Sequence, residues 1–246
     1  MAGGGTAGAE GSSGSDALVA VASDLARSLQ VVHGDVEATL QMITARMVEG
    51  VPGAQHAGIT LVTEGGRLES RATTGPLPEK VDALQGESGQ GPCLQALWSE
   101  RTVQVTDMAT ETRWPLFASR ALEVGVASML CFQLFVRGHT LGGLNLHAEQ
   151  PRAFTQESVR TGRVFATHAA IALSAALEQE HLRAAVDSHT VVGQATGIVM
   201  ERYRIPAEEA LEVLSRASQD TNTRLRRVAE SVVTTGSFGT TIPAGR

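Results

Sequence analysis

The chain has 246 residues, 42% of them hydrophobic, which is enough for two modest domains that each bury a core. Its formal net charge of −6 excludes a protein that coats nucleic acid without specificity, because such binding needs an excess of cations. Two cysteines without CxxC spacing indicate neither a disulfide framework nor a zinc cluster.

The beginning of the chain predicts a tail and two helices. Residues 1–15 are mostly Gly, Ala and Ser, a composition typical of a disordered tail. They lack the plan of a signal peptide, and no apolar run approaches the span of a bilayer, so we expect a cytoplasmic protein. A helix is expected from Asp16 and a second after Asp35, which ends at Val51-Pro52-Gly53.

The apolar period then changes from helical to strand-like. Turn residues at 64–66 and 137–139 predict two β-hairpins. The expected strands are 56–63, 67–72, 102–106, 127–136 and 140–147. The short helices expected between them are 78–85, 94–98 and 114–124. This order predicts an α+β domain, with an antiparallel sheet and its helices segregated to one face.

A glycine-rich loop at 86–93 leads into the helix at 94–98. It lacks the Lys and Ser/Thr of a P-loop and the GxGxxG spacing, so it does not favour nucleotide binding. We interpret Cys93 as a small buried residue and Cys131 as a core residue. The scattered His56, His139 and His147 are expected at the surface or in loops, and no metal site is expected.

Four short motifs in this region resemble the GAF domain, in the form paired with ANTAR in actinobacterial regulators. They are GQGPCLQA at 89–96, Asp107 with RWP at 113–115, GVAS at 125–128 and LGGLNL at 141–146. The resemblance implies a sensor domain, placed at residues 16–178, with a pocket between sheet and helices. GAF domains hold small ligands such as cyclic nucleotides, haem or bilins there. The ligand of this chain is unknown, and the GAF pocket is the candidate site for a small molecule.

From Phe154 the chain predicts one uninterrupted helix that continues into the C-terminal region. Mostly apolar and small residues recur on it at alternating four- and three-residue steps, the pattern of a coiled coil or a shared bundle edge, although His168, Glu178 and His189 are poor occupants of such positions. We call these positions the seam: Val164, His168, Ile171, Ala175, Glu178, Leu182, Ala185, His189, Val192, Thr196 and Val199. The seam predicts a homodimer in which a parallel helical pair transmits the state of the sensor domain.

The C-terminal region predicts a bundle of three helices. The first spans 182–203. The second begins at Ile205-Pro206, with Pro206 at the first helical position. The third follows Thr223, a plausible N-cap, and ends at Gly236.

The same region resembles the ANTAR domain, a three-helix RNA-binding module of transcription antiterminators. The resemblance is carried by QATGIVM at 194–200, Glu209-Ala210, Leu214, Ser218 and Leu225-x-x-Val228-Ala229. It implies an ANTAR domain at residues 179–235, followed by a disordered tail at 236–246. It also implies binding to stem-loops in nascent leader transcripts, which prevents a terminator hairpin from forming.

Candidate RNA-binding residues come from this resemblance and from the basic residues of the third helix. Arg224 and Arg227 lie on one side, away from the apolar stripe, and favour phosphate contacts. Arg202 and Tyr203 are candidates for stacking on an unpaired base. The full set is Gln194, Thr196, Gly197, Arg202, Tyr203, Arg216, Arg224, Arg226 and Arg227. The family usually carries Arg where this chain has His189 and Lys where it has Thr196, so two cationic contacts are missing.

Taken together, the sequence predicts a signal-responsive transcription antiterminator that is not an enzyme, since no nucleophile–base motif occurs. The alternative is a sensor whose helical C-terminal domain docks a partner protein without RNA binding. Expected partners are RNA stem-loops and a second copy of the chain, with RNA polymerase or an upstream signalling protein as further candidates. No membrane partner is expected.

Overall fold

The computed structural model describes residues 23, 27–28, 34–63 and 65–238. By contacts the chain divides into two compact units, Met1–Glu178 and Gln179–Arg246. The tail expected at 1–15, nearly all of the helix expected from Asp16, and residues 239–246 lie outside the described residues. Among the described residues, no helix is both long and apolar enough to cross a membrane.

The helix predicted after Asp35 is confirmed as α2, Val36–Gly50. The Asp35 carboxylate accepts a hydrogen bond from the Ala38 N–H at 2.9 Å, which caps the first turn. Leu40, Ile43 and Met47 recur on one face and are fully buried. These residues therefore fix which face of α2 packs on the sheet.

The five predicted strands form one antiparallel sheet. They are β1 (His56–Val62), β2 (Leu68–Arg71), β3 (Thr102–Val105), β4 (Ser128–Val136) and β5 (His139–Ala148). Their order in the sheet is β2-β1-β5-β4-β3, and every neighbouring pair is antiparallel. Both predicted hairpins, β1–β2 and β4–β5, are confirmed. Arg137 and Gly138 have positive φ angles, as a tight two-residue hairpin turn requires.

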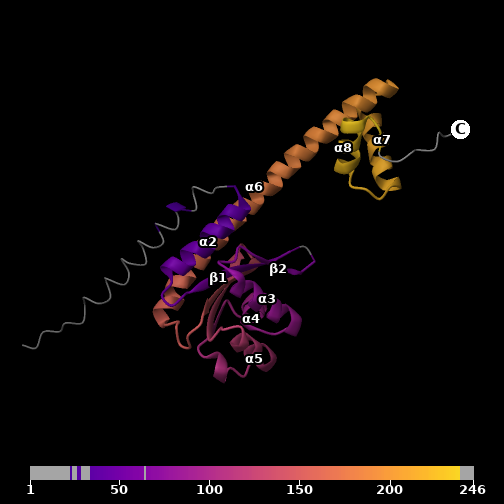
Figure 1. The fold of residues 1–246 in the computed structure, drawn as a ribbon. Helices are drawn as coiled ribbons and strands as arrows, with labels where there is room; N and C mark the ends of the chain where they lie inside the picture. Colours follow the sequence, from indigo (N-terminus) through magenta and orange to yellow (C-terminus); the bar gives the residue numbers. More distant parts are fainter. Residues whose placement is uncertain (1–22, 24–26, 29–33, 64, 239–246) are drawn as a thin grey trace, which may run out of the picture. The chain divides into compact units, whose positions relative to one another are not determined.

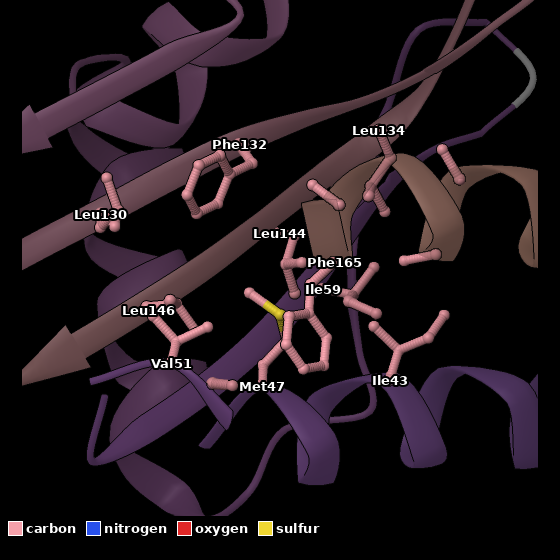
Figure 2. Packing of buried hydrophobic residues seen from close by; sticks show 14 of the residues in the cluster. Ile43, Met47, Val51, Ile59, Leu130, Phe132, Leu134, Leu144, Leu146 and Phe165 are labelled. Atoms are coloured by element: carbon pink, nitrogen blue, oxygen red, sulfur yellow. The ribbon is translucent and has the colours of Figure 1, made fainter. Parts of the chain in front are cut away.

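Helices cover both faces of this sheet, so the prediction that they are segregated to one face is wrong. One face packs against α2 and the first half of a long helix, α6 (Gln156–Tyr203), as Figures 1 and 2 show. The opposite face packs against the three short helices. Strands β4 and β5 consist mostly of buried residues, and a long apolar run of this kind is typical of a strand buried on both sides.

The short helices are α3 (Pro76–Ser88), α4 (Pro92–Trp98) and α5 (Pro115–Glu123), each with a proline in its first turn. A single 3-10 turn, η1 (Met108–Thr110), was not predicted. Helix α3 extends beyond the predicted 78–85 and includes Gly86, so the glycine-rich loop is reduced to residues 89–91. Gly89 ends α3 in the left-handed conformation, which glycine adopts without strain.

The C-terminal unit contains the second half of α6 together with α7 (Ala207–Asp220) and α8 (Leu225–Thr235). Small and branched side chains from the three helices form one core: Ala195, Val199, Ala210, Leu214, Ala217, Val228, Ala229 and Val232, with Phe238. The three predicted helices are confirmed, but two of their boundaries differ. Pro206 is the N-cap of α7, and Arg224 rather than Thr223 is the N-cap of α8. Gly236 ends α8 in the left-handed conformation, as predicted.

Close packing of α6 on the sheet depends on Gly162. A Cβ added there would lie 2.3 Å from the Phe132 ring, so we expect Gly162→Ala to lower the free energy of unfolding by about 1–3 kcal/mol. Gly86→Ala is the matched control in the same unit, because nothing lies within 4 Å of its added Cβ. We expect this control to gain about 0.5–1 kcal/mol from helix propensity. Urea denaturation measures both, and equal effects would contradict the packing argument.

Candidate functional site

The residues proposed on α6 differ in how accessible they are. Gln194 and Gly197 are exposed and three residues apart, so they share one helix face. The Thr196 hydroxyl donates to the Val192 carbonyl at 2.8 Å, and the residue is half-buried. Its hydroxyl therefore already has a partner within its own helix.

Arg202 has a structural partner. Its guanidinium donates a hydrogen bond to the carbonyl of Gly236, the residue that ends α8. This contact ties the end of α6 to the end of α8 and satisfies one terminal carbonyl. The neighbouring Tyr203 is 53% exposed, which is high for an aromatic ring and leaves it accessible for stacking.

The remaining arginines fall into two classes. Arg216 pairs with Glu212 at 3.4 Å and Arg226 pairs with Glu230 at 2.8 Å, so each of these charges has an acidic neighbour one turn away. Arg224 and Arg227 are exposed, and the described residues offer their side chains no hydrogen bond or ion pair. They are the two cations of the set that remain available for an external anion.

Arg224 and Arg227 stand at the N-terminal end of α8. No side chain caps this end, and its first turn contains no acidic residue. The unpaired N–H groups and the helix dipole give such an end a positive potential that favours an anion. Arg202 marks the other end of α8, about 16 Å away for an 11-residue helix. The structure thus places Arg202, on α6, at the opposite end of α8 from Arg224 and Arg227, so these predicted residues do not form one patch.

A second site, which the sequence analysis did not locate by residue, is a cavity of about 300 Å³ in the first unit. It lies between α3, α4 and strands β1 and β2. Its lining residues are Thr60, Leu68, Ser70, Glu79, Asp82, Ala83, Gln85, Gly86, Cys93 and Leu94. The one signal in the sequence was the presence of polar Thr60 and Asn145 inside otherwise apolar strands.

A hydrogen-bonded network forms the polar part of this cavity. The Thr60 hydroxyl donates to one carboxylate oxygen of Asp82 at 2.9 Å. The Asn145 side-chain amide donates to the Thr60 hydroxyl at 3.1 Å and to the other Asp82 oxygen at 3.4 Å. Burial raises the pKa of Asp82, while hydrogen bonds from Ser70, Thr60 and Asn145 partly lower it.

The turn between α3 and α4 closes one wall of the cavity. The Gln85 side-chain oxygen accepts a hydrogen bond from the Cys93 N–H at 2.9 Å and so caps the start of α4. A Cβ on Gly91 would lie 2.3 Å from that oxygen, which explains the glycine of the GQGPC motif. Burial raises the pKa of the Cys93 thiol to about 12. Cys93 is buried, as the sequence indicated, and Cys131 is buried in the core as predicted.

The position predicted for His147 is wrong. It lies within β5 and is fully buried, and neither ring nitrogen has a hydrogen-bond partner among the described residues. Because β5 is a central strand, His147 lies between two neighbouring strands, opposite His56 in β1 and Met129 in β4, which shield it from water. Burial, with a smaller contribution from His56, lowers the pKa of His147 to about 3.

Comparison with known families separates the same two parts of the chain. The model of the GAF domain matches residues 33–174. The model of the ANTAR domain matches residues 180–233. No curated protein matches the chain.

Solved structures resemble the first unit. One is a free methionine-R-sulfoxide reductase from Neisseria meningitidis, solved with its substrate: it is 21% identical, with a TM-score of 0.51, over 72% of this chain and 98% of the reductase. Another is the GAF domain of a phosphoenolpyruvate-protein phosphotransferase from Coxiella burnetii: it is 17% identical, with a TM-score of 0.53, over 67% of this chain and 96% of that domain. At such identities the likeness shows the fold alone.

Burial of neutral His147 makes stability depend on pH. An unfolded histidine binds a proton near pH 6.5, whereas His147 in the folded protein binds one only near pH 3. We therefore expect the free energy of unfolding to fall as pH decreases below about 6.5, by up to about 1.4 kcal/mol per pH unit from this group.

Urea denaturation at pH 7, 6 and 5 tests this expectation. The His147→Gln variant should show a shallower pH dependence than the parent chain, whereas His139→Gln, at the exposed first residue of β5, should not. Parallel pH profiles for the parent chain and His147→Gln would show that His147 is not the group responsible.

Proposed function

This chain belongs to the GAF domain family and continues into an ANTAR domain, and from this premise we propose that it is a signal-responsive transcription antiterminator. The GAF domain, residues 16–178, senses a small molecule or another signal. The ANTAR domain, residues 179–235, binds stem-loops of nascent transcripts in the cytoplasm. Both domains are regulatory ones, and we assign no catalytic residue.

The observation that carries the RNA-binding proposal is the positive end of α8. Arg224 and Arg227 are exposed without acidic partners, next to helix N–H groups that no side chain caps. Phosphate oxygens are suitable ligands for both kinds of donor. Since the whole chain has a net charge of −6, RNA binding requires such a local concentration of positive charge.

Exposed apolar residues on α6 support a homodimer. From residue 178 to residue 190 no residue of α6 is buried. The seam residues Ile171 and Leu182 are 58% and 62% exposed. The segment 178–190 gains little stability from packing within one chain. A second copy with the same seam would cover the exposed side chains.

Because α6 contributes to both cores, it is also the proposed route for the signal. Ala169 and Leu173 pack beneath the sheet, while Ala195 and Val199 belong to the core of the C-terminal unit. A change in the GAF domain that alters the packing of α6 would reach residues of the RNA-binding domain through one continuous helix. RNA polymerase and an upstream signalling protein remain candidate partners.

The RNA proposal predicts a specific loss. RNA cross-linked to the parent chain and sequenced should be enriched in stem-loops, and one such stem-loop then serves as probe in fluorescence anisotropy. We expect Arg224→Gln with Arg227→Gln to weaken binding at least tenfold and to reduce the slope of log affinity against log salt by about 2.

The matched control is Arg160→Gln with Arg163→Gln, which removes the same charge from exposed positions of α6 in the GAF domain. The control should bind as the parent chain does. Equal losses in both variants would indicate a general charge effect. An absence of enriched stem-loops from a folded parent chain would favour the protein-docking alternative.

The homodimer proposal predicts that Leu182→Glu yields a monomer, because two charges would meet across the seam. Sedimentation equilibrium over a hundredfold range of concentration measures this. Ala184→Glu is the control, since two residues along the helix place it on the opposite side from the seam. A parent chain that is monomeric at every concentration would refute the dimer and the paired-helix mechanism with it.

A further inference from the structure

The cavity of the GAF domain has an unusual balance of charge. Its two charged lining residues are Glu79 and Asp82, both acidic, and no Lys, Arg or His of the described residues lines it. A phosphate or carboxylate ligand would meet like charge here without a compensating cation. The lining therefore disfavours cyclic nucleotides and other anions and favours a cation.

Asn145 supports the polar part of the cavity lining. The Asn145 side chain is fully buried, and its amide nitrogen lies within 3.4 Å of both Thr60 and Asp82, two residues of the lining. Asn145 itself is not among the residues that line the cavity. Its hydrogen bonds orient Thr60 and Asp82, so Asp82 is the polar group that a ligand would meet.

The Asp82 carboxylate lacks a cationic partner. Its partners are hydroxyl and amide groups, and within the described part of the chain no cation neutralises it. A desolvated carboxylate gains most from a partner that brings both a positive charge and hydrogen-bond donors. An ammonium group supplies both, with three donors on one atom.

The other walls are apolar. Leu68, Ala83, Cys93 and Leu94 contribute side chains without charge. The volume of about 300 Å³ is at the small end of ligand pockets and suits a short aliphatic or aromatic body. The protonated thiol of Cys93 adds no nucleophile, so binding is non-covalent.

We propose that the GAF cavity binds a small primary amine, whose ammonium group pairs with Asp82 and whose apolar body packs against Leu68 and Leu94. This inference rests on the proposed sensory role of the GAF domain and names the chemical class of its signal. Glu79, exposed at the cavity, strengthens the selection for cations as the ligand enters.

Isothermal titration calorimetry on the full chain tests this proposal with three compounds that share one apolar body. They are n-pentylamine, 1-pentanol and pentanoate. We expect n-pentylamine to bind at least tenfold more tightly than 1-pentanol, and pentanoate not to bind. Cyclic AMP, titrated as a second anion, should not bind either. Equal binding of amine and alcohol, or tighter binding of either anion, would overturn the proposal.

Two variants locate the binding site. Asp82→Asn keeps the shape of the side chain and should weaken n-pentylamine at least tenfold while leaving 1-pentanol unchanged. Ala83→Leu, at an exposed lining position, fills the cavity and should abolish binding of both compounds with the fold intact by circular dichroism. If Asp82→Asn does not fold, the Ala83→Leu variant still shows whether the compounds bind in this cavity. Glu87→Gln, on α3 but outside the lining, is the control for charge and should bind as the parent chain does.

Stem-loop binding measured on the same samples separates this inference from the proposed function. Selective amine binding without RNA binding would leave the cavity assignment intact and refute the antiterminator. RNA binding without amine selectivity would refute the cavity assignment and leave the antiterminator proposal intact.

Discussion

The fold depends on one constraint, the burial of the central hairpin β4–β5 on both faces. Leu130, Phe132 and Leu144 point to one face and Met129 and Cys131 to the other, so neither face can be left to water. One face is covered by α2 and α6 and the other by α3, α4 and α5. The same arrangement produces the cavity between α3, α4 and the sheet. It also makes α6, which continues into the C-terminal unit, part of the core of the first unit.

The two proposed sites have opposite electrostatic characters. The cavity is acidic and partly open, and the Asp82 carboxylate lies among neutral donors. The α8 end is basic and open, and the described residues offer Arg224 and Arg227 no acidic partner there. The net charge of −6 therefore conceals two local regions of opposite sign, and we expect each region to select a different kind of ligand. Total charge alone could exclude a non-specific nucleic-acid coat, but it could not identify either site.

Local patterns in the sequence predicted most of the secondary structure, because caps, hairpin turns and apolar periods act over a few residues. Asp35, Gly138 and Gly236 are examples whose chemistry determines the local backbone. What the sequence did not predict depends on long-range contacts. The Thr60–Asp82–Asn145 network joins residues up to 85 positions apart. Arg202 was interpreted as a base-stacking residue because its contact with Gly236, 34 residues away, cannot be read from spacing.

The length of α6 restricts how chains of this kind can change in evolution. Each residue inserted into its exposed segment, 178–190, would turn all the following positions by about 100° around the helix axis. Leu182 and Val192 would then no longer share a face with Ile171. Seven residues complete nearly two turns and restore the alignment. Insertions and deletions in this segment should therefore persist in whole heptads, which makes its length a more restricted property than its exposed amino acids.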